Sequence, residues 1–218
     1  MHRAGLAATL NAQLVLLVAT GLAAVANWWS RAVENDAVER WSKPLTTILV
    51  IGLALVSGAP RDQIVVAVIA LTLCLAGDVF LMPVVDNFVL GLASFLLGHL
   101  AFIVLFFQYG LENVQLAGIA IVLAALLAVS IGKVIVQGAA FADKKLAKPV
   151  LAYLLIISAM AVVGWSTAMP WVILGTLLFV VSDSILGWRQ FVGQKAWMGP
   201  AVMITYHGAI VSLALSLW

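Results

Sequence analysis

The stretch Gly77-Asp78-Val79-Phe80-Leu81-Met82 decides how the chain can fold, because it places an ionisable side chain at the end of a long apolar segment. The preceding segment, Ile64 to Ala76, contains no charged residue. A second ionisable residue, His99, follows 21 residues after Asp78, inside the next apolar segment. Placing a charged side chain in the centre of a membrane helix costs about 2.5–3.5 kcal/mol, so such residues are rare and are usually functional. We therefore expect the function of the chain to depend on this region.

The composition indicates an all-α polytopic membrane protein. Of 218 residues, 65% are hydrophobic and 9% are charged, whereas a soluble domain has about 25% charged residues. A helix of about 20 apolar residues crosses a bilayer, and the chain has room for eight. A membrane β-barrel would require alternating polarity, but the apolar segments here are continuous. The net charge of +2 is too small and too scattered to indicate nucleic-acid binding.

Eight apolar segments are predicted to be membrane-spanning helices. The second is short, and its proline at position 44 is expected in the first helical turn, after a polar loop over residues 30–42. The N-terminal segment, ending in Ala24-Val25-Ala26, also fits a cleavable signal peptide; we favour a span, because the repeat described below requires it. The predicted spans are 6–26, 44–57, 62–81, 87–109, 114–136, 149–165, 171–188 and 197–218.

The lysines and arginines predict the orientation. With eight spans, Arg3 and Arg61 lie on one side of the membrane and the other nine on the opposite side, which the positive-inside rule makes cytoplasmic. Both termini are then outside, and the bacterial cytoplasmic membrane is the expected location. The nine residues are Arg31, Arg40, Lys43, Lys133, Lys144, Lys145, Lys148, Arg189 and Lys195.

The chain also contains signs of an internal duplication. Three elements recur at similar offsets: Lys43-Pro44 as Lys148-Pro149 and Gly77-Asp78 as Ser182-Asp183, both after 105 residues, and Gly98-His99 as Tyr206-His207 after 108. Because each half contains four spans, equivalent helices run in the same direction, which predicts a parallel repeat. We predict one membrane domain, 1–218, made of pseudo-repeats 1–112 and 113–218.

Asp78 and Asp183 are the main candidates for catalysis. The predicted topology places both near the cytoplasmic ends of equivalent helices, facing one central cavity. In a poorly solvated cavity two carboxyl groups resist ionising together, so one stays protonated and the other charged. Such a pair supplies a general acid and a general base. The structural alternative is that Lys43 and Lys148, predicted at the same level, merely neutralise the two carboxylates.

Five further residues are candidates for substrate binding. His99 and His207 lie deeper in their spans, where histidine commonly bridges helices by a hydrogen bond. The two histidines and the aspartates could together bind a metal, but no closely spaced ligand pair is present and we predict no metal. Tyr153 and Tyr206 are candidate phenol donors. Ser182 is a candidate contact; as a nucleophile it lacks the Gly-x-Ser-x-Gly context. Lys43 and Lys148 are also candidate contacts to a lipid phosphate.

These residues form a pattern that resembles the YhhN-like lysoplasmalogenase family over nearly the whole chain. The resemblance implies an eight-span enzyme that hydrolyses the vinyl ether bond of lysoplasmalogens to a fatty aldehyde and a glycerophospho-base. It implies Asp78 and Asp183 as the catalytic pair and requires no metal or organic cofactor. The motifs are Lys43-Pro44, Gly77-Asp78-x-x-Leu81-Met82, Phe88-x-x-Gly91-x-x-x-Phe95-x-x-Gly98-His99 and Phe179-x-x-Ser182-Asp183-Ser184.

The chemistry of vinyl ether hydrolysis fits a carboxyl pair. A general acid protonates the β-carbon, and water traps the resulting oxocarbenium ion with help from an ionised carboxylate. The expected partners are a lysophospholipid-like substrate and the lipid bilayer. Two alternatives stay open: a proton-coupled transporter, since such carriers also contain repeats with intramembrane acids, and a lipid-binding protein without turnover. The sequence predicts no particular oligomeric state.

Overall fold

The computed structural model describes the backbone of residues 2–218 and the side chains of residues 10–218. The predictions for Arg3 and for a signal sequence beginning at Met1 concern parts outside the described side chains. Within the described residues the chain is 83% helical and has no strand. The all-α prediction is therefore confirmed.

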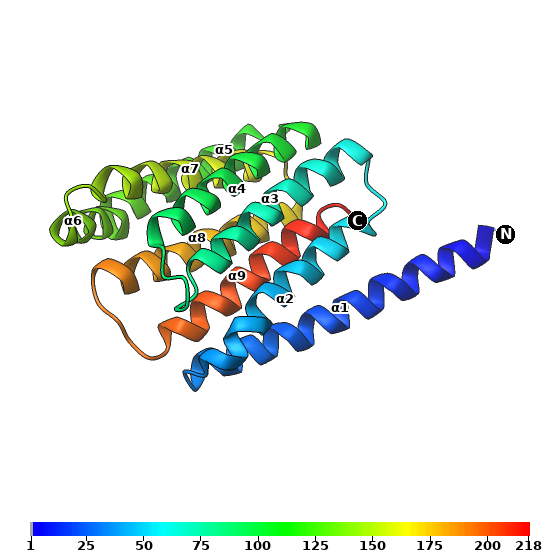
Figure 1. The fold of residues 1–218 in the computed structure, drawn as a ribbon. Helices are drawn as coiled ribbons and strands as arrows, with labels where there is room; N and C mark the ends of the chain where they lie inside the picture. The colour runs from blue at the N-terminus through cyan, green and yellow to red at the C-terminus, as the bar shows by residue number, and fades with distance from the viewer. Residues whose placement is uncertain (1) are drawn as a thin grey trace.

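The helices follow one another with short connections (Figure 1). Among the described residues, seven helical segments are long and apolar enough to cross a membrane, α5 to α6 counting as one. The remaining helix, α2, has 20 residues but four charged ones in its first half, so an eighth crossing stays a prediction. The helices are α1 (His2–Ala32), α2 (Asp36–Leu55), α3 (Arg61–Phe80), α4 (Phe88–Tyr109), α5 (Val114–Leu127), the π-helical segment η1 (Ala128–Gly132), α6 (Lys133–Ala142), α7 (Ala147–Ser166), α8 (Pro170–Phe191) and α9 (Met198–Leu215).

The predicted polar loop over residues 30–42 is wrong. Helix α1 continues to Ala32 and α2 already begins at Asp36. The Asn35 side chain caps α2 by accepting a hydrogen bond from the Val38 backbone nitrogen at 3.1 Å, and this cap allows a helix to start among polar residues. Pro44 consequently lies inside α2 rather than in its first turn. The helices therefore extend into the polar residues that flank the apolar segments.

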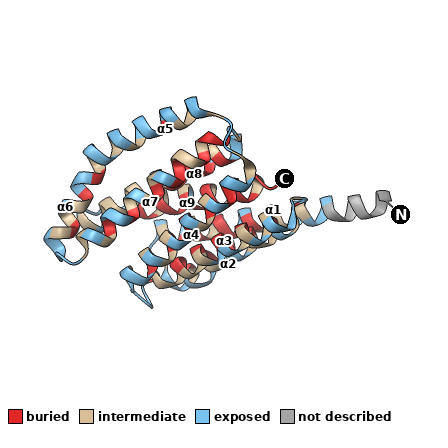
Figure 2. Cartoon of the chain, turned by 90° about the horizontal axis from the view of Figure 1, so that it is seen from above, coloured by how far each residue is buried: buried red, intermediate tan, exposed pale blue. Residues whose placement is uncertain are grey.

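Helix α9 lies at the centre of the bundle, and α1 and α5 lie on opposite sides of it (Figures 1 and 2). In α9, 61% of the residues of the apolar stretch are buried inside the bundle, whereas in the segment from α5 to α6 only 17% are. Helix α3 packs against α4, and α8 packs against α9. Contacts of α4 with α7 and of α2 with α9 join the N-terminal and C-terminal halves of the chain. The apolar core between these helices includes Leu53, Phe102, Phe106, Phe179 and Leu213.

Close contact between α3 and α4 positions the region around Asp78. A Cβ atom on Gly98 would lie 3.2 Å from both the Ala70 carbonyl oxygen and Cys74 Sγ. A Cβ on Gly77 would lie 2.5 Å from the Phe95 ring. These glycines have no side chain to separate the helices, so α4 packs directly against the helix that carries Asp78.

The segment from α5 to α6 is one irregular helical rod on the outside of the bundle. It contains the π-helical turn η1 and reaches Ala142, six residues beyond the predicted span end at Val136. Its α6 end packs closely on α8, because a Cβ on Gly138 would overlap the Phe191 carbonyl. Its α5 part stands away from α8 in Figure 2. A π-turn inside an α-helix frequently marks a functional site.

Candidate functional site

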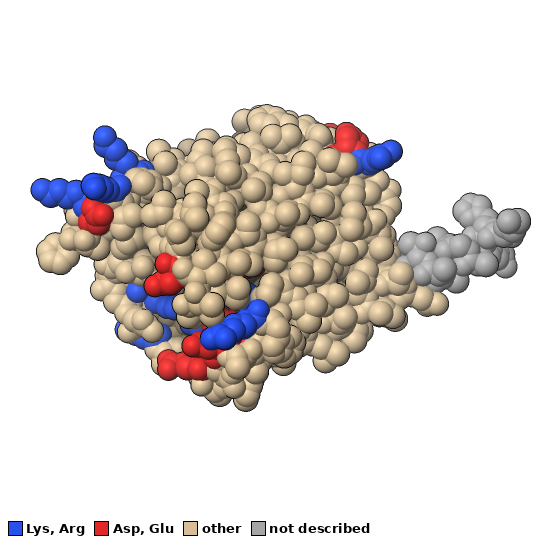
Figure 3. Space-filling view, in the orientation of Figure 1, with Lys and Arg blue, Asp and Glu red and all other residues tan. Residues whose placement is uncertain are grey.

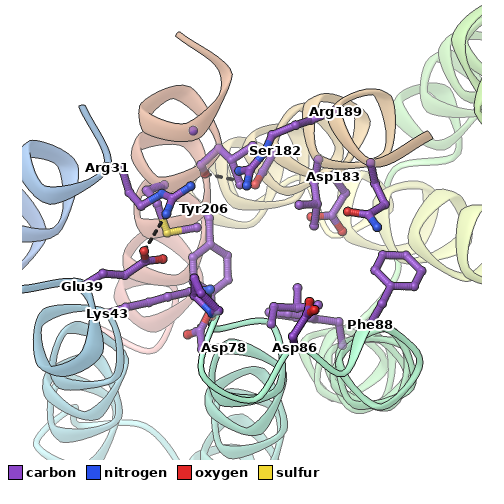
Figure 4. A pocket seen from close by; sticks show the side chains of 18 residues that line it. Arg31, Glu39, Lys43, Asp78, Asp86, Phe88, Ser182, Asp183, Arg189 and Tyr206 are labelled. Carbon is purple, nitrogen blue, oxygen red and sulfur yellow. Dashed lines mark hydrogen bonds and ion pairs between the residues drawn. The ribbon is translucent and has the colours of Figure 1, made fainter. Parts of the chain in front are cut away.

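A cavity of about 290 Å³ contains most of the charged side chains buried in the bundle. It is formed by α1, α2, α3, α4, α8, α9 and the α3–α4 connection (Figure 4). Asp78 and Asp183 both line it, on opposite sides in Figure 4. The lining residues are Arg31, Glu39, Lys43, Asp78, Leu81, Pro83, Asp86, Phe88, Phe95, Ser182, Asp183, Leu186, Arg189, Gln190, Gly199, Val202, Met203 and Tyr206.

Asp78 is fully buried and has three polar partners. Lys43 Nζ forms an ion pair with its Oδ1 at 3.5 Å, while Thr47 Oγ1 and the Tyr206 hydroxyl donate to its Oδ2 at 2.7 and 2.8 Å. Asp78 lies two residues before the end of α3, where the helix dipole disfavours a negative charge. The ammonium group and the two hydroxyls favour the charged form against that effect and against the loss of water. This carboxylate is held in one place.

Asp183 has a different environment. It is half-buried, and the Tyr153 hydroxyl donates to its Oδ2. Among the described residues, no Lys or Arg nitrogen forms an ion pair with it. The predicted partner Lys148 is exposed at the start of α7 and does not line the cavity. The second carboxyl group is therefore more accessible than the first and has no cation beside it.

Ser182 and Tyr206 connect the cavity wall to the bundle. The buried Ser182 hydroxyl donates to the Val202 carbonyl of α9 at 3.1 Å, so it links α8 to α9. Tyr206 lies edge-on to Phe95, with ring centroids 5.7 Å apart, while its hydroxyl reaches Asp78. Both predicted contact residues are in the cavity wall, and the serine hydroxyl is already engaged.

Comparison with known proteins adds one result to this geometry. A model of the YhhN family matches residues 38–217, which include α2 to α9 nearly completely and both carboxyl groups. The chain belongs to the YhhN family. YhhN is the lysoplasmalogenase family, so the resemblance identified from the sequence motifs is confirmed. No curated protein and no solved structure gave a match.

His99 and His207 of this YhhN protein are buried and do not line the cavity. His99 lies edge-on to the rings of Tyr153 and Phe179, with centroids 5.3 and 4.6 Å away. Among the described residues, neither of its ring nitrogens has a hydrogen-bond partner. His207 accepts a hydrogen bond at Nδ1 from Trp28 Nε1 at 3.0 Å. The bridging role predicted for such a histidine is thus seen at His207, which joins α9 to α1.

Four charged residues of the cavity were not predicted. Arg31 and Glu39 form an ion pair of 2.5 Å between α1 and α2, and Arg189 and Asp86 line the cavity from α8 and from the α3–α4 connection. Within the described side chains, Arg189 takes part in no ion pair. Arg31 and Arg189 had been attributed only to the positive-inside rule. The sequence signal that could have identified them is their position at the ends of apolar segments, because a charged side chain at the end of a membrane helix can point into the bundle.

The charged residues gather at one end of the molecule, where α6 and the α1–α2 connection lie (Figure 3). A smaller group lies at the opposite end. The cavity belongs to the charge-rich end, because Arg31, Glu39 and Lys43 come from the α1–α2 region. An amphipathic molecule would therefore find a polar opening at this end and apolar surfaces along the helices.

Proposed function

We propose that this YhhN-family membrane protein hydrolyses the vinyl ether bond of a lysoplasmalogen or a similar single-chain ether lipid. The observation that carries the proposal is that two carboxyl groups from different halves of the chain, Asp78 and Asp183, line one cavity. Family membership supports hydrolase activity, and the cavity supplies the acid–base pair that such a hydrolase requires.

The unequal surroundings of the two carboxyl groups support different roles. Lys43 and two hydroxyl donors stabilise Asp78 in its charged form, which suits a general base and a stabiliser of positive charge. Asp183 forms no ion pair with any lysine or arginine side chain that the structure describes, and the Tyr153 hydroxyl donates to only one of its oxygens. The other oxygen is available to carry a proton toward the substrate. Asp183 is accordingly the general acid in this proposal.

The reaction then proceeds in three steps. Asp183 donates a proton to the β-carbon of the alkenyl ether, and the resulting oxocarbenium ion is stabilised by the Asp78 carboxylate. Water adds to the α-carbon and loses a proton to Asp78, and the product of this addition is a hemiacetal. As the hemiacetal C–O bond to glycerol breaks, the Asp183 carboxylate takes the hemiacetal hydroxyl proton and Asp78 gives its proton to the glycerol oxygen, so both carboxyl groups regain their starting states. The products are a fatty aldehyde and a glycerophospho-base, with no net consumption of protons.

Two arginines favour a phospholipid headgroup in the cavity. Arg189 lines it without an ion pair among the described side chains, and Arg31 lines it beside Glu39. A guanidinium group presents several N–H donors in a plane, which suits phosphate oxygens. Lys43, one of the two lysines considered for this contact, is already paired with Asp78. We therefore place the phosphate at Arg189, and Asp86, which lines the cavity from the α3–α4 connection, faces any amine of the headgroup.

The same proposal includes the membrane arrangement. The equivalent helix pairs in the two halves and the reciprocal contacts of α4 with α7 and α2 with α9 support a parallel four-helix repeat with eight crossings. The charge-rich end, with the cavity (Figure 3), is the cytoplasmic side by the positive-inside rule. The substrate then comes from the cytoplasmic leaflet of the membrane.

The test is release of aldehyde from a lysoplasmalogen by the purified protein in mild detergent. We expect Asp183→Asn and Asp78→Asn each to lower kcat at least a thousandfold, because each removes a proton-transfer group. Asp62→Asn is the matched control, since Asp62 is exposed and outside the cavity. Gel filtration and thermal unfolding establish that the variants are folded. Turnover that persists in both folded variants would disprove the carboxyl mechanism, and an inactive parent protein would disprove the hydrolase proposal.

A further inference from the structure

Asp183 borders a second cavity, on the side of α8 that faces the outer rod. This cavity has a volume of about 230 Å³ and lies between η1, α6, α7 and α8. Its walls are mainly aliphatic, as with Leu127, Ile131, Leu154 and Val180. Asp183 is the residue that this apolar cavity shares with the polar cavity of Figure 4. The carboxyl group thus stands at a junction between a polar and an apolar space.

The apolar space continues along α5. A further cavity of about 390 Å³ shares Leu127, Ile131, Ser158, Val180 and Ser184 with it, and extends to Ala120. Ile131 and Ala120 are eleven residues apart, about 16 Å along a helix axis. One leaflet of a bilayer contributes about 15 Å of hydrocarbon. The groove therefore has the length of a single lipid chain within one leaflet.

We propose that this groove, between the α5–α6 rod and helices α7 and α8, binds the single hydrocarbon chain of the lipid substrate. The inference rests on the proposed function and deepens it by assigning the chain-binding site. Entry is sideways from the bilayer, where α5 stands away from α8 (Figure 2). The π-turn η1 shapes the groove, since Ala128, Ile131 and Gly132 of this turn line it.

The junction at Asp183 matches the chemistry of the substrate. In an alkenyl ether lipid the reactive double bond lies between the polar glycerol and the rest of the chain. With the chain in the groove and the phosphate at Arg189, the β-carbon belongs to the groove side and the ether oxygen to the polar side. Asp183 borders both spaces, whereas Asp78 borders only the polar cavity among those described. The proton is thus delivered from the chain side and the water from the polar side.

Chain-length selectivity tests the site. Ala128→Leu and Ala124→Leu each fill the groove at a different depth, and Ala125→Leu is the matched control, because the exposed Ala125 lines neither cavity. We expect the groove variants to raise KM at least tenfold for a long-chain lysoplasmalogen and less than twofold for a short-chain one. Ala125→Leu leaves both values within twofold of the parent. Equal effects of all three substitutions would overturn the assignment.

A second measurement does not depend on turnover. The Asp183→Asn variant is illuminated with a lysophosphatidylcholine that carries a diazirine at the end of its chain, and labelled peptides are identified. We expect labelling near Ala120, Ala161 and Trp165, at the end of the groove away from Asp183, competition by unlabelled lysophosphatidylcholine, and loss of labelling in a variant that also carries Ala128→Leu. Even labelling of the lipid-facing helices without competition would show an annular lipid and overturn the site. Competed labelling in the groove of a protein that has no vinyl ether activity would refute the proposed reaction while supporting the chain site.

Discussion

The two aspartates occupy corresponding places in the sequence, 105 residues apart, but the structure surrounds them differently. Asp78 is completely buried, forms an ion pair with Lys43 and accepts hydrogen bonds from Thr47 and Tyr206. Asp183 is half-buried, and among the described side chains only the Tyr153 hydroxyl donates a hydrogen bond to it. Two carboxyl groups that follow similar apolar segments thus have different partners in the structure. The partners, more than the motif, distinguish an acid from a base.

The helices that carry the aspartates also differ in length beyond them. Helix α3 ends at Phe80, two residues after Asp78, whereas α8 continues to Phe191, eight residues after Asp183. The extension carries Arg189 to the cavity. The end of α3 instead turns into the connection that carries Asp86. One half of the chain thus supplies a fixed charge pair, and the other supplies an accessible carboxyl group and a cation.

The largest difference is expected when the two lysines are removed. Lys43→Met leaves Asp78 buried without its cation, and loss of one partner of a buried ion pair costs about 3–5 kcal/mol. Lys148→Met removes an exposed side chain outside the cavity, so its effect is expected within about 0.5 kcal/mol. The measurement is the unfolding free energy in detergent.

The double variant Lys43→Met with Asp78→Asn sharpens this comparison. It removes both charges, so we expect it to recover most of the stability lost in Lys43→Met alone. If Lys43→Met and Lys148→Met destabilise the protein equally, the Lys43–Asp78 pair is not a major contributor and the asymmetry of the two halves disappears.

Most of the fold could be predicted from hydropathy. The errors occurred where a helix extends beyond its apolar segment. The long apolar runs identified the cores of the helices, because a membrane helix must satisfy its own backbone hydrogen bonds. The start of α2 at Asp36 was missed because a helix capped by Asn35 can begin among charged residues. The extension of α6 to Ala142 was missed because Gln137 and Gly138 interrupt the apolar segment, although the helix continues through them.

The candidate site could be predicted only in part. Asp78 and Asp183 stood out as carboxyl groups beside uncharged segments. The symmetry argument then placed Lys148 and the histidines with them, but helix rotation directs His99 toward aromatic rings and His207 toward Trp28. The spacing of residues in a sequence determines which side chains lie on the same face of a helix. Which neighbouring helix or cavity that face contacts depends on how the helices pack. Arg189 was not predicted for this reason.

The tyrosines allow a finer test of the two environments. Tyr153→Phe removes the hydroxyl that positions Asp183, and a displacement of about 1 Å of a reacting group can cost about a hundredfold in rate. We expect kcat to fall about ten- to a hundredfold. Tyr206→Phe leaves Thr47 and Lys43 on Asp78, so its kcat is expected to fall less than tenfold. A larger loss in Tyr206→Phe would reverse the proposed assignment of roles, with Asp78 then the more sensitive group.

The smallest expected effect concerns the arginine on the extension of α8. Arg189→Gln removes the cation proposed to contact the phosphate while chemistry at Asp183 continues, so KM should rise about fivefold, equivalent to about 1 kcal/mol, with kcat unchanged. Added salt should raise KM of the parent protein and have little effect on the variant, because salt screens a partly exposed ion pair. Arg40→Gln is the control, since Arg40 is exposed and outside the cavity. If both variants change KM alike, general attraction of the charge-rich end for anionic lipid explains the effect, and the difference between the ends of α3 and α8 has no role in headgroup binding.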